Sequence, residues 1–573
     1  MTGKTDTTRG GSIARRLDTR MDRRDVLSGA AALGAALTVP RITFAQNSTP
    51  GAASPSASPG NTPIAGPGGS SYVPSGIEGV PDAYLTYPQP FQASSQAPGS
   101  GGTVRSLILS FSPPPTPKDG NPFWQELEKR LNVTWEVDLA PPGVYEEKSA
   151  TYLAGGDLPD FFFLLPGSTP QQYLAMEQGA FLDLTPYLTG DALGQFPNLA
   201  RIPQFVWDNS AFKGQILGVP KSVGRVGNVP FYRSDWAAVV GFAQNTGPQS
   251  VSDMLTAFTT NDPDGNGNPD TFGLGRYGEG WTCWDPLLAT QAFRVPYEWR
   301  LNADGTLTNQ IETDEYRQAL DYLRTLWTRG AYHPDSPGMG FSDAQTNFIG
   351  GRTGMHTEGF GSFFGTGNVG YRQREINPTA TIEPLFPVGM DGQPGLTYNY
   401  VGYFGMVAIP ATFGGDEEHV LELLRILDYM ACPFGSDEAT FLAAGIEGIH
   451  YERNAAGAPV LNDRSTADRS DIAGLIGPEP VIFYPENPQD ALTVLGYSQR
   501  SVQLGIDNPV QRLYAPSSAE LLPSLTQLGT DRVTSIVTGR DAFDSLDTAI
   551  QDWRDRGGDQ IRDELQEALQ QQG

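Results

Sequence analysis

The amount of chain that has to fold is the feature that most constrains this protein. Residues 1–45 indicate a twin-arginine export signal, because Arg23 and Arg24 precede an apolar stretch and a small-x-Ala cleavage site ends at Ala45. Residues 46–103 are predicted to be a spacer, most clearly in the first half, which is rich in Ser, Pro and Gly. Roughly 500 residues remain, more than one hydrophobic core normally supports, so we expect at least two lobes.

The signal also bears on where the protein resides. Its apolar part, residues 27–40, is shorter than the ~20 residues of a membrane-spanning helix, and no later stretch supplies one. No cysteine follows this part directly, so the lipid attachment used by many exported binding proteins is not available. We expect an extracellular, cell-surface or periplasmic protein, with retention by an uncleaved signal as an open alternative.

The composition is strongly acidic. Of 38 Lys and Arg and 65 Asp and Glu, eight and four lie in residues 1–45, which leaves 30 basic and 61 acidic residues. Such a charge argues against nucleic acid as a partner and favours solubility outside the cell. Cys283 and Cys432 provide no disulfide framework; we expect two buried free thiols, while a single bridge stays open.

The first folded residues follow a strand, helix, strand pattern. Residues 106–111 are an apolar run that predicts a buried parallel strand, and residues 133–137 predict another. Between them, Asn121 can cap a helix that begins at Pro122. Apolar residues at helical spacing predict one buried face in this helix and in two later ones: Phe123, Leu127 and Leu131; Tyr316, Leu320, Leu323 and Trp327; Ile561, Leu565 and Leu569. The pattern predicts an α/β lobe with a parallel sheet.

Oxygen-bearing side chains occupy every second position of residues 262–270. An EF-hand loop takes ligands from positions 1, 3, 5, 7 and 9, with glycine at position 6. The corresponding residues are Asp262, Asp264, Asn266, Asn268 and Asp270, with Gly267 at position 6. The sequence therefore predicts a structural Ca²⁺ ion.

The match to an EF-hand loop ends at position 12. Gly273 stands there in place of the bidentate Glu, so a closing ligand would have to come from elsewhere. The alternative is a solvated turn, because Asp, Asn, Gly and Pro are also the commonest turn residues.

Six short segments, in order, resemble signatures of extracellular solute-binding proteins of ABC importers. They are YLAGGDLPD (152–160), GAFLDLT (179–185), KGQILGVP (213–220), YRSDW (232–236), GIEGIHY (445–451) and WRDRGG (553–558). The last two resemble the large oligosaccharide-binding branch, which includes alginate-binding proteins and in which an EF-hand-like loop recurs at the place of residues 262–270. The resemblance runs from about Val104 to the end of the chain.

This resemblance implies a two-lobed α/β fold of the periplasmic-binding-protein type II, with a hinge between two discontinuous lobes. The expected boundaries are residues 104–230 and 396–453 for lobe 1, and 231–395 and 454–573 for lobe 2. The chain is expected to cross between the lobes near residues 229–236 and 398–410. The implied function is that a monomer captures an oligosaccharide, or another small polar solute, in the cleft and delivers it to the permease subunits of an ABC transporter.

An exported carbohydrate-active enzyme, a hydrolase or lyase on a similar scaffold, is the alternative. The sequence has no Walker A loop, no H-E-x-x-H and no G-x-S-x-G motif. A glycosidase needs only two carboxylates, however, so the sequence alone leaves this chemistry open. The resemblance favours the binding protein.

A sugar site needs flat aromatic rings for the sugar faces and polar side chains for the hydroxyls. Glu279, Trp281 and Trp284 form the best such cluster, in a glycine-rich loop after the predicted metal site. We expect the two tryptophans to stack on the ligand. The alternative is that they belong to a hydrophobic core.

Further candidates lie at the expected crossings and at a strand end that the resemblance places in the cleft. They are Tyr232, Arg233, Asp235, Trp236, Glu358, Tyr398 and Asn399. Arg233 and Asp235 either bind ligand hydroxyls or pair with each other. The net negative charge argues against a uronate polymer as ligand, unless Arg225, Arg233 or Arg276 makes the cleft locally basic.

Overall fold

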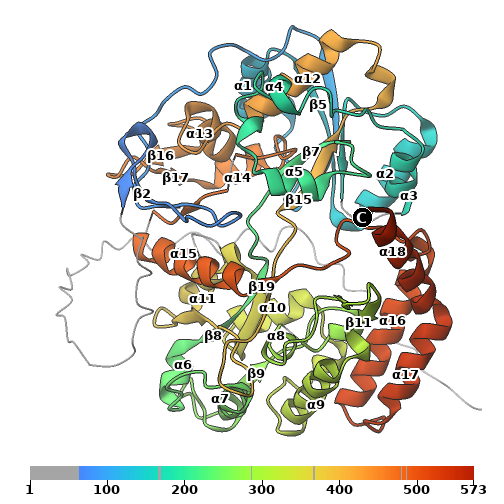
Figure 1. The fold of residues 1–573 in the computed structure, drawn as a ribbon. Coiled ribbons are helices and arrows are strands. Elements are labelled where there is room, and N and C mark those ends of the chain that lie inside the picture. The colour runs from blue at the N-terminus through green and yellow to red at the C-terminus, as the bar shows by residue number, and fades with distance from the viewer. Residues whose placement is uncertain are drawn as a thin grey trace, which may run out of the picture. The chain divides into compact units, whose positions relative to one another are not determined.

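The computed structural model describes residues 63–165, 170–285, 287–364, 368–478, 480–485 and 487–572. The predicted export signal and residues 46–62 of the predicted spacer lie outside these ranges. The described chain forms two α/β lobes, each made of several stretches of sequence (Figure 1). This is the two-lobed fold that the resemblance implies.

Lobe 1, in the upper half of Figure 1, is built on a five-stranded sheet. The strand order is β5-β4-β6-β15-β7, with bounds β4 (Thr103–Leu109), β5 (Thr134–Ala140), β6 (Phe161–Leu164), β7 (Val219–Ser222) and β15 (Tyr403–Ala408). β4 is parallel to β5 and β6, as the strand, helix, strand pattern predicts. The helices are α1 (Pro122–Leu131), α2 (Pro142–Gly155), α3 (Pro170–Glu177), α4 (Gly190–Leu193), α5 (Gln204–Ser210), α12 (Glu417–Met430), α13 (Asp437–Ala444) and α14 (Asp463–Arg469).

Local sequence sets both ends of α1. The Asn121 side chain accepts a hydrogen bond from the Trp124 N–H (3.0 Å), and Pro122 takes the first helical position. Asn132 ends the helix in the left-handed conformation (φ 53°). The predicted apolar face is buried, through Phe123, Leu127 and Leu131.

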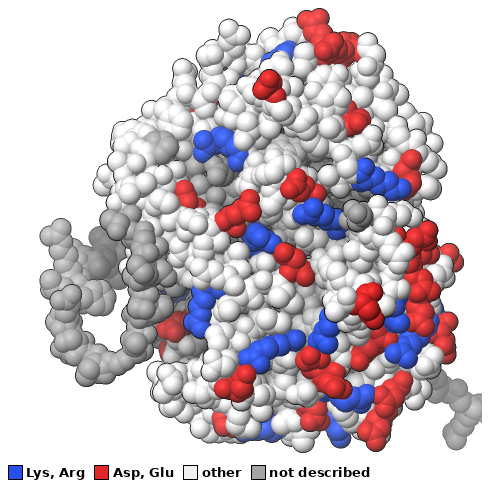
Figure 2. Space-filling model, viewed as in Figure 1, with Lys and Arg blue, Asp and Glu red and all other residues white. Residues whose placement is uncertain are grey.

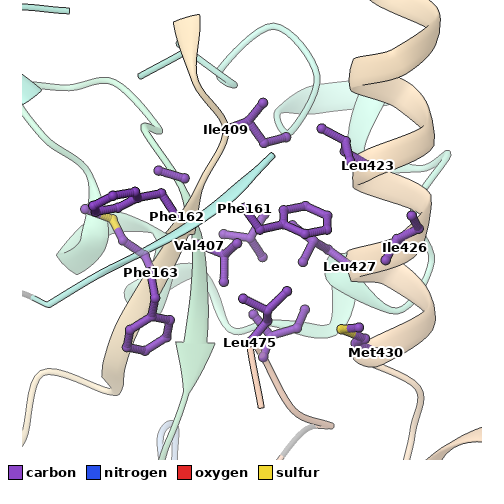
Figure 3. Packing of buried hydrophobic residues seen from close by; sticks show 14 of the residues in the cluster. Phe161, Phe162, Phe163, Val407, Ile409, Leu423, Ile426, Leu427, Met430 and Leu475 are labelled. Atoms are coloured by element: carbon purple, nitrogen blue, oxygen red, sulfur yellow. The ribbon is translucent and has the colours of Figure 1, made fainter. Parts of the chain in front are cut away.

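The core of lobe 1 lies between its sheet and α12. Figure 3 shows α12 side chains pointing toward strands β6 and β15. The contributing residues include Phe161, Phe162, Val407, Leu423, Ile426, Leu427 and Met430. Burial of each side chain contributes about 1.5–3 kcal/mol, so this layer fixes the sheet from which the site residues project.

Lobe 2, in the lower half of Figure 1, is built on a four-stranded mixed sheet. The order is β13-β8-β12-β9, with bounds β8 (Asn228–Arg233), β9 (Phe272–Leu274), β12 (Thr353–Gly359) and β13 (Ile382–Pro384). β8 is antiparallel to β12 and β13, whereas β12 is parallel to β9. A hairpin joins β10 (Trp299–Leu301) and β11 (Leu307–Asn309).

The helices of lobe 2 pack around its sheet and hairpin. They are α6 (Ser234–Val239), α7 (Pro248–Thr260), α8 (Ala289–Ala292), α9 (Asp314–Thr328), α10 (Phe341–Ile349), α11 (Val369–Ile376), α15 (Pro488–Gln503), α16 (Ser518–Val537), α17 (Ser545–Trp553) and α18 (Asp559–Gln572). The predicted apolar faces of α9 and α18 are buried, through Tyr316, Leu320, Leu323, Ile561 and Leu565.

The chain passes between the lobes at defined places. Residues 223–227 lead from β7 to β8, and residues 399–402 lead back from β14 (Thr397–Tyr398) to β15. The first crossing comes before the expected residues 229–236, because all of β8 belongs to the lobe 2 sheet. The chain crosses again between Ile476, in the core of lobe 1, and β18 (Ile482–Phe483).

Lobe 1 extends beyond its predicted end at residue 453. β16 (Tyr451–Arg453) and β17 (Pro459–Leu461) form a hairpin across that boundary. After α14, Ile472 and Leu475 are buried in the lobe 1 core, and the Trp135 indole donates to the Ile472 carbonyl (3.0 Å). Residues 454–476 therefore belong to lobe 1 and not to lobe 2.

The described part of the predicted spacer, residues 63–103, is folded. β1 (Ile64–Ala65), β2 (Ser71–Val73), β3 (Ala83–Tyr84) and β18 form a sheet in that order. Val73 and Ala83 are fully buried against lobe 2 residues, while the Tyr87 hydroxyl is 2.8 Å from the Thr440 hydroxyl of lobe 1. The structure differs from the composition-based prediction because a few apolar side chains are enough to anchor a Pro- and Gly-rich segment.

The surface and the cysteines agree with the composition. Figure 2 shows Asp and Glu concentrated at the lower right, over α16, α17 and α18. Cys283 and Cys432 are both free and buried, as expected. Within the described ranges, no helix is both long enough and apolar enough to cross a membrane.

Candidate functional site

Strand directions show which edge of the lobe 1 sheet faces lobe 2. The connection 223–227 leaves the carboxyl end of β7, so this end lies at the boundary between the lobes. β15 runs antiparallel to β7 and β6, pairing Tyr403 with Ser222 and Met406 with Leu164, and β4 is parallel to β6. The carboxyl ends of β4 and β6 therefore face lobe 2.

The same reasoning applies to lobe 2. The connection enters β8 at Asn228, which pairs with Gly359 at the carboxyl end of β12, and β9 is parallel to β12. The carboxyl ends of β9 and β12 therefore face lobe 1. Open α/β sheets bind ligands outside the carboxyl ends of their strands. The two facing edges form the candidate ligand site.

The lobe 1 edge carries an exposed aromatic ring on a well-anchored loop. Phe111, two residues after β4, is exposed, and its ring contacts Phe404. One carboxylate oxygen of Asp471 accepts hydrogen bonds from the Ser110 hydroxyl (2.7 Å) and the Phe111 N–H (3.0 Å). Lys221 of β7 donates to the Gly474 carbonyl (2.8 Å). Burial lowers the pKa of Lys221, and the Asp471 carboxylate opposes this shift.

The lobe 2 edge combines a carboxylate with aromatic rings. Glu358 is the last residue but one of β12; it accepts a hydrogen bond from Gln345 (2.9 Å) and lies 3.3 Å from the His356 imidazole. Burial opposes ionisation of Glu358, but these contacts outweigh it and hold the pKa of Glu358 below its ordinary value. The Tyr277 ring lies 5.4 Å from that of Phe341. This edge presents an ionised acceptor beside aromatic surface.

The hinge is formed where three segments lie side by side. Val226 of the first connection forms an antiparallel bridge with Asn399, and β14 pairs in parallel with β19 (Gly505–Ile506). Arg225 forms an ion pair with Asp507 and stacks over the Phe205 ring. These contacts tie both crossings to the segment that precedes α16.

The two lobes also contact each other directly. The Tyr173 ring of lobe 1 stacks on Tyr514 of lobe 2, with centroids 3.2 Å apart and an interplanar angle of 17°. The Arg512 guanidinium of lobe 2 donates to the Asn209 side chain of lobe 1 (2.8 Å). Asn209 in turn donates to the Val401 carbonyl in the second connection (2.8 Å). These contacts join the two lobes beside the hinge segments.

The structure places the two predicted tryptophans, Trp281 and Trp284, in different surroundings. Trp284 is 0% exposed; its indole donates to the Thr534 hydroxyl (3.0 Å) and packs edge-on against Tyr332. A fully buried ring offers no face to a ligand, so Trp284 is a core residue and not the expected stacking platform. Trp281 is half-buried, packs against Gly529 of α16, and stays a prediction.

The predicted cluster at residues 232–236 lies away from the ligand-facing edge. β8 enters from lobe 1 at Asn228 and ends at Arg233, about 17 Å farther on at ~3.3 Å per residue. Arg233 is buried and pairs with Asp235 (2.7 and 2.5 Å), the alternative that the sequence left open. Trp236 is buried beneath the Arg233 guanidinium, and Tyr232 donates to Glu383 (3.0 Å).

The other predicted residues lie at the site or the hinge. Glu279 is exposed in the loop after β9, at the same sheet edge as Glu358. Tyr398 stacks on Tyr297 (4.7 Å), and its hydroxyl donates to the Val295 carbonyl (3.0 Å). Asn399 is buried in the hinge. Contact of these side chains with a ligand stays a prediction.

None of the three arginines that could make the cleft basic is free. Arg225 pairs with Asp507, and Arg233 pairs with Asp235. The buried Arg276 guanidinium donates to the Met339 and Gly278 carbonyls (3.2 Å each). These three arginines are therefore not available to make the cleft basic, and the expectation against a uronate ligand stands without that exception.

The sequence analysis missed Phe111, Tyr277 and Phe341. Phe111 was assigned to the buried strand because it continues the apolar run 106–111, yet β4 ends at Leu109. Tyr277 and Phe341 lie outside the cluster of Glu279, Trp281 and Trp284, to which the sequence assigned ligand binding. The usable signal was position directly after a strand, since that is where α/β sheets place their ligands.

The predicted Ca²⁺ loop follows α7. Asp262 adopts the left-handed conformation (φ 45°), which an Asp tolerates better than most residues, and its carboxylate accepts from the Gly267 N–H (2.9 Å). The Asn266 amide contacts carboxylate oxygens of Asp264 (2.8 Å) and Asp270 (3.1 Å). The oxygen-rich side chains of alternate positions therefore converge.

The donor chemistry of this loop fits Ca²⁺. Partial burial, together with the neighbouring Asp262 and Asp270 carboxylates, raises the pKa of Asp264, a repulsion that a cation would relieve. A side chain at Gly273 would meet the Leu255 and Ala331 carbonyls, which explains why no position-12 ligand is present. Among described residues, no three His, Cys, Asp or Glu side chains are already arranged around a metal, so amide and carbonyl oxygens would have to contribute.

Comparison with known proteins places the fold in a family. A family model described as bacterial extracellular solute-binding protein matches residues 124–415, more than half of the chain. The chain belongs to this family. It is 24% identical, over 78% of its length and 88% of the relative's, to the polygalacturonan/rhamnogalacturonan-binding protein YtcQ of Bacillus subtilis.

Solved structures of solute-binding proteins share the fold. An HMO-binding, ABC-transporter-associated protein from Bifidobacterium longum infantis has a TM-score of 0.62 at 15% identity, over 82% of this chain and 98% of that one. The substrate-binding protein FusA of Streptococcus pneumoniae, in complex with kestose, has a TM-score of 0.60 at 15% identity, over 82% and 99%. Another structure of FusA is described as an EF-hand mutant.

Proposed function

We propose that this solute-binding protein captures an oligosaccharide between its lobes and delivers it to the permease of an ABC importer. The observation that carries the proposal is that both sheets turn their carboxyl edges toward each other, with Phe111 on one edge and Glu358 on the other. An aromatic face and a carboxylate are what sugar C–H faces and hydroxyls require. The sugar ligands named for YtcQ and FusA support the same class.

Capture would proceed by hinge closure. Arg225, Asn399 and Ile506 belong to the segments that lie side by side at the hinge, where a small backbone rotation separates the lobes. A ligand that touches both edges stabilises the closed state, because only that state offers both sets of contacts. The Tyr173–Tyr514 stack would assist closure and would be lost on opening.

We infer that the ligand is an uncharged sugar chain that is released intact, and in its charge it differs from the polygalacturonan named for YtcQ. Glu358 and Glu279 place negative charge at the lobe 2 edge, while Arg225, Arg233 and Arg276 are engaged within the protein. A uronate chain would meet repulsion there. The binding role of the family supports delivery of intact ligand in place of hydrolysis or cleavage.

The proposal also covers how the protein is exported, which ion it holds and whether it acts as a monomer. Arg23 and Arg24 support transport by the twin-arginine route to an extracellular, cell-surface or periplasmic location. Residues 262–270 support one structural Ca²⁺ ion. The protein would act as a monomer and would contact the permease subunits only during delivery.

A thermal-shift titration of the exported protein with Ca²⁺ tests the proposal. The probes are kestose, maltohexaose and tetragalacturonic acid, and any binding sugar is recovered and analysed by chromatography. We expect a shift with a neutral sugar that is recovered intact. Shortened product would replace the receptor by an enzyme, and absence of any shift across the neutral probes would contradict an oligosaccharide ligand of this class.

A further inference from the structure

One large apolar side chain is exposed at the ligand-facing edge of lobe 1. Phe111 is 67% exposed, although it lies only two residues beyond β4, an interior strand of the sheet. A single exposed apolar side chain is ordinary on a protein surface; this one is distinguished by its place directly after a sheet strand, at the edge where α/β sheets bind ligands. The other two residues of the loop, Ser110 and Ser112, have small side chains, so Phe111 is the only large side chain that the loop presents.

The loop that carries Phe111 is held firmly. A single carboxylate oxygen of Asp471, from the segment after α14, accepts hydrogen bonds from the Ser110 hydroxyl and from the N–H groups of Phe111 and Ser112 (2.7, 3.0 and 3.1 Å). Charge-assisted bonds of this kind are stronger than neutral ones. The exposure of Phe111 therefore belongs to a defined loop conformation.

Aromatic rings support Phe111 from behind. Phe163 is buried in β6, Phe404 of β15 is half-buried next to it (6.2 Å), and Phe111 meets Phe404 edge-on (5.8 Å). The three rings lead from the core of lobe 1 to its ligand-facing edge. Phe111 stays largely exposed beside Phe404, so most of its side chain is accessible to another molecule.

Polar groups accompany this surface. The Lys221 ammonium lies at the same edge, bonded to the Gly474 carbonyl, and interacts with Asp471. A sugar ring needs such a pairing, because its C–H face stacks on an aromatic ring while its hydroxyls bond to polar groups at the rim. A purely apolar ligand would make no use of these polar groups.

We propose that Phe111 is the platform on which lobe 1 stacks a sugar ring of the captured oligosaccharide. The inference rests on the proposed function and deepens it, since it assigns the stacking role to lobe 1 and to a phenylalanine. Lobe 2 then supplies hydroxyl partners such as Glu358.

Three substitutions at residue 111 test the role by isothermal titration with whichever of kestose and maltohexaose binds the wild type. Phe111→Ala is expected to weaken binding tenfold or more, and Phe111→Leu to weaken it similarly because a branched aliphatic chain has no flat face. Phe111→Trp should bind within about threefold of the wild type. Val239→Ala, a 65% exposed residue on α6, serves as the control with unchanged affinity.

Each outcome decides a separate point. Melting temperatures of the substituted proteins should stay close to that of the wild type, because the Phe111 ring is exposed. Wild-type affinity in Phe111→Ala overturns the platform while leaving the proposed function intact. Equal affinity of Phe111→Leu and wild type would mean that residue 111 makes a plain apolar contact with the sugar and does not stack on it. This result also overturns the platform. A wild type that binds neither sugar removes the proposed function, and the platform with it.

Discussion

Two aromatic segments, one around Trp284 in lobe 2 and one around Phe111 in lobe 1, are exposed in the opposite way to what their sequences suggest. Trp284 lies among glycines and polar residues that suggest an open loop, yet it is completely buried. Phe111 continues an apolar run that suggests a buried strand, yet it is among the most exposed apolar side chains described. The difference is positional, because Phe111 follows the carboxyl end of a sheet strand whereas Trp284 packs under α16. Strand ends, and not aromatic density, therefore guide the choice of the candidate ligand site.

The largest expected effect tests whether Trp284 belongs to the core. We expect Trp284→Ala to lower the free energy of unfolding by about 3–5 kcal/mol, because it empties a packed site and leaves the Thr534 hydroxyl without the indole donor. Denaturant titration measures the change, with Val239→Ala as an exposed control within about 0.5 kcal/mol of wild type. A Trp284→Ala protein of wild-type stability would break the comparison.

The next effect concerns the loop that precedes the tryptophan segment. Chelation of Ca²⁺ should destabilise the protein by about 2.7 kcal/mol relative to a solution at a hundredfold excess over the dissociation constant. Differential scanning calorimetry with and without chelator checks this, and Asp262→Ala should abolish the response. The samples are the wild type and Asp262→Ala, each with and without chelator. An identical melting temperature in all four would assign residues 262–270 to an ordinary turn.

Glu358 extends the comparison to the lobe 2 edge. Glu358→Gln should weaken neutral oligosaccharide by about 1.5–3 kcal/mol, because a charged acceptor is replaced by a neutral amide. The pKa of Glu358 is lowered from 4.5 in the folded protein, so its contribution is present at neutral pH and is lost as pH falls through the lowered pKa. Titrations at several pH values measure this; a Glu358→Gln protein with wild-type affinity would exclude the carboxylate from the site.

The smallest effect concerns closure. Tyr514→Ala removes the ring stacked on Tyr173 without touching either sheet edge. We expect the affinity for oligosaccharide to fall by about 0.5–1.5 kcal/mol, mainly through faster ligand release, because the closed state loses one aromatic contact. Stopped-flow measurements separate the rates. Unchanged release would mean that the stack does not hold the lobes together.

Periodicity and capping predicted much of the fold. The caps and buried face of α1, the apolar faces of α9 and α18 and the parallel unit around β4 follow from local patterns, because neighbours along the chain decide them. The division into two lobes followed from length, and the family resemblance supplied their discontinuity. Composition misjudged residues 63–103, because Val73 and Ala83 anchor that segment through contacts with residues far along the chain.

The site was harder to predict because it depends on strand direction. Tyr232 and Arg233 were expected to contact ligand because the resemblance put a crossing near residues 229–236, whereas β8 meets the boundary between the lobes at its beginning, Asn228. Register and direction are set by pairing between distant segments, which a single sequence does not display. Glu279 and Glu358 do lie at the edge of the lobe 2 sheet that faces lobe 1, and their contact with a ligand stays a prediction.

The folded N-terminal segment has a mechanical consequence. Gly79 accepts a hydrogen bond from the Arg225 N–H in the first connection (2.8 Å), and β3 pairs with β18 just after the third crossing. The N-terminal segment is therefore fastened beside two of the three crossings, so a rotation about the hinge would be felt by its own hydrogen bonds.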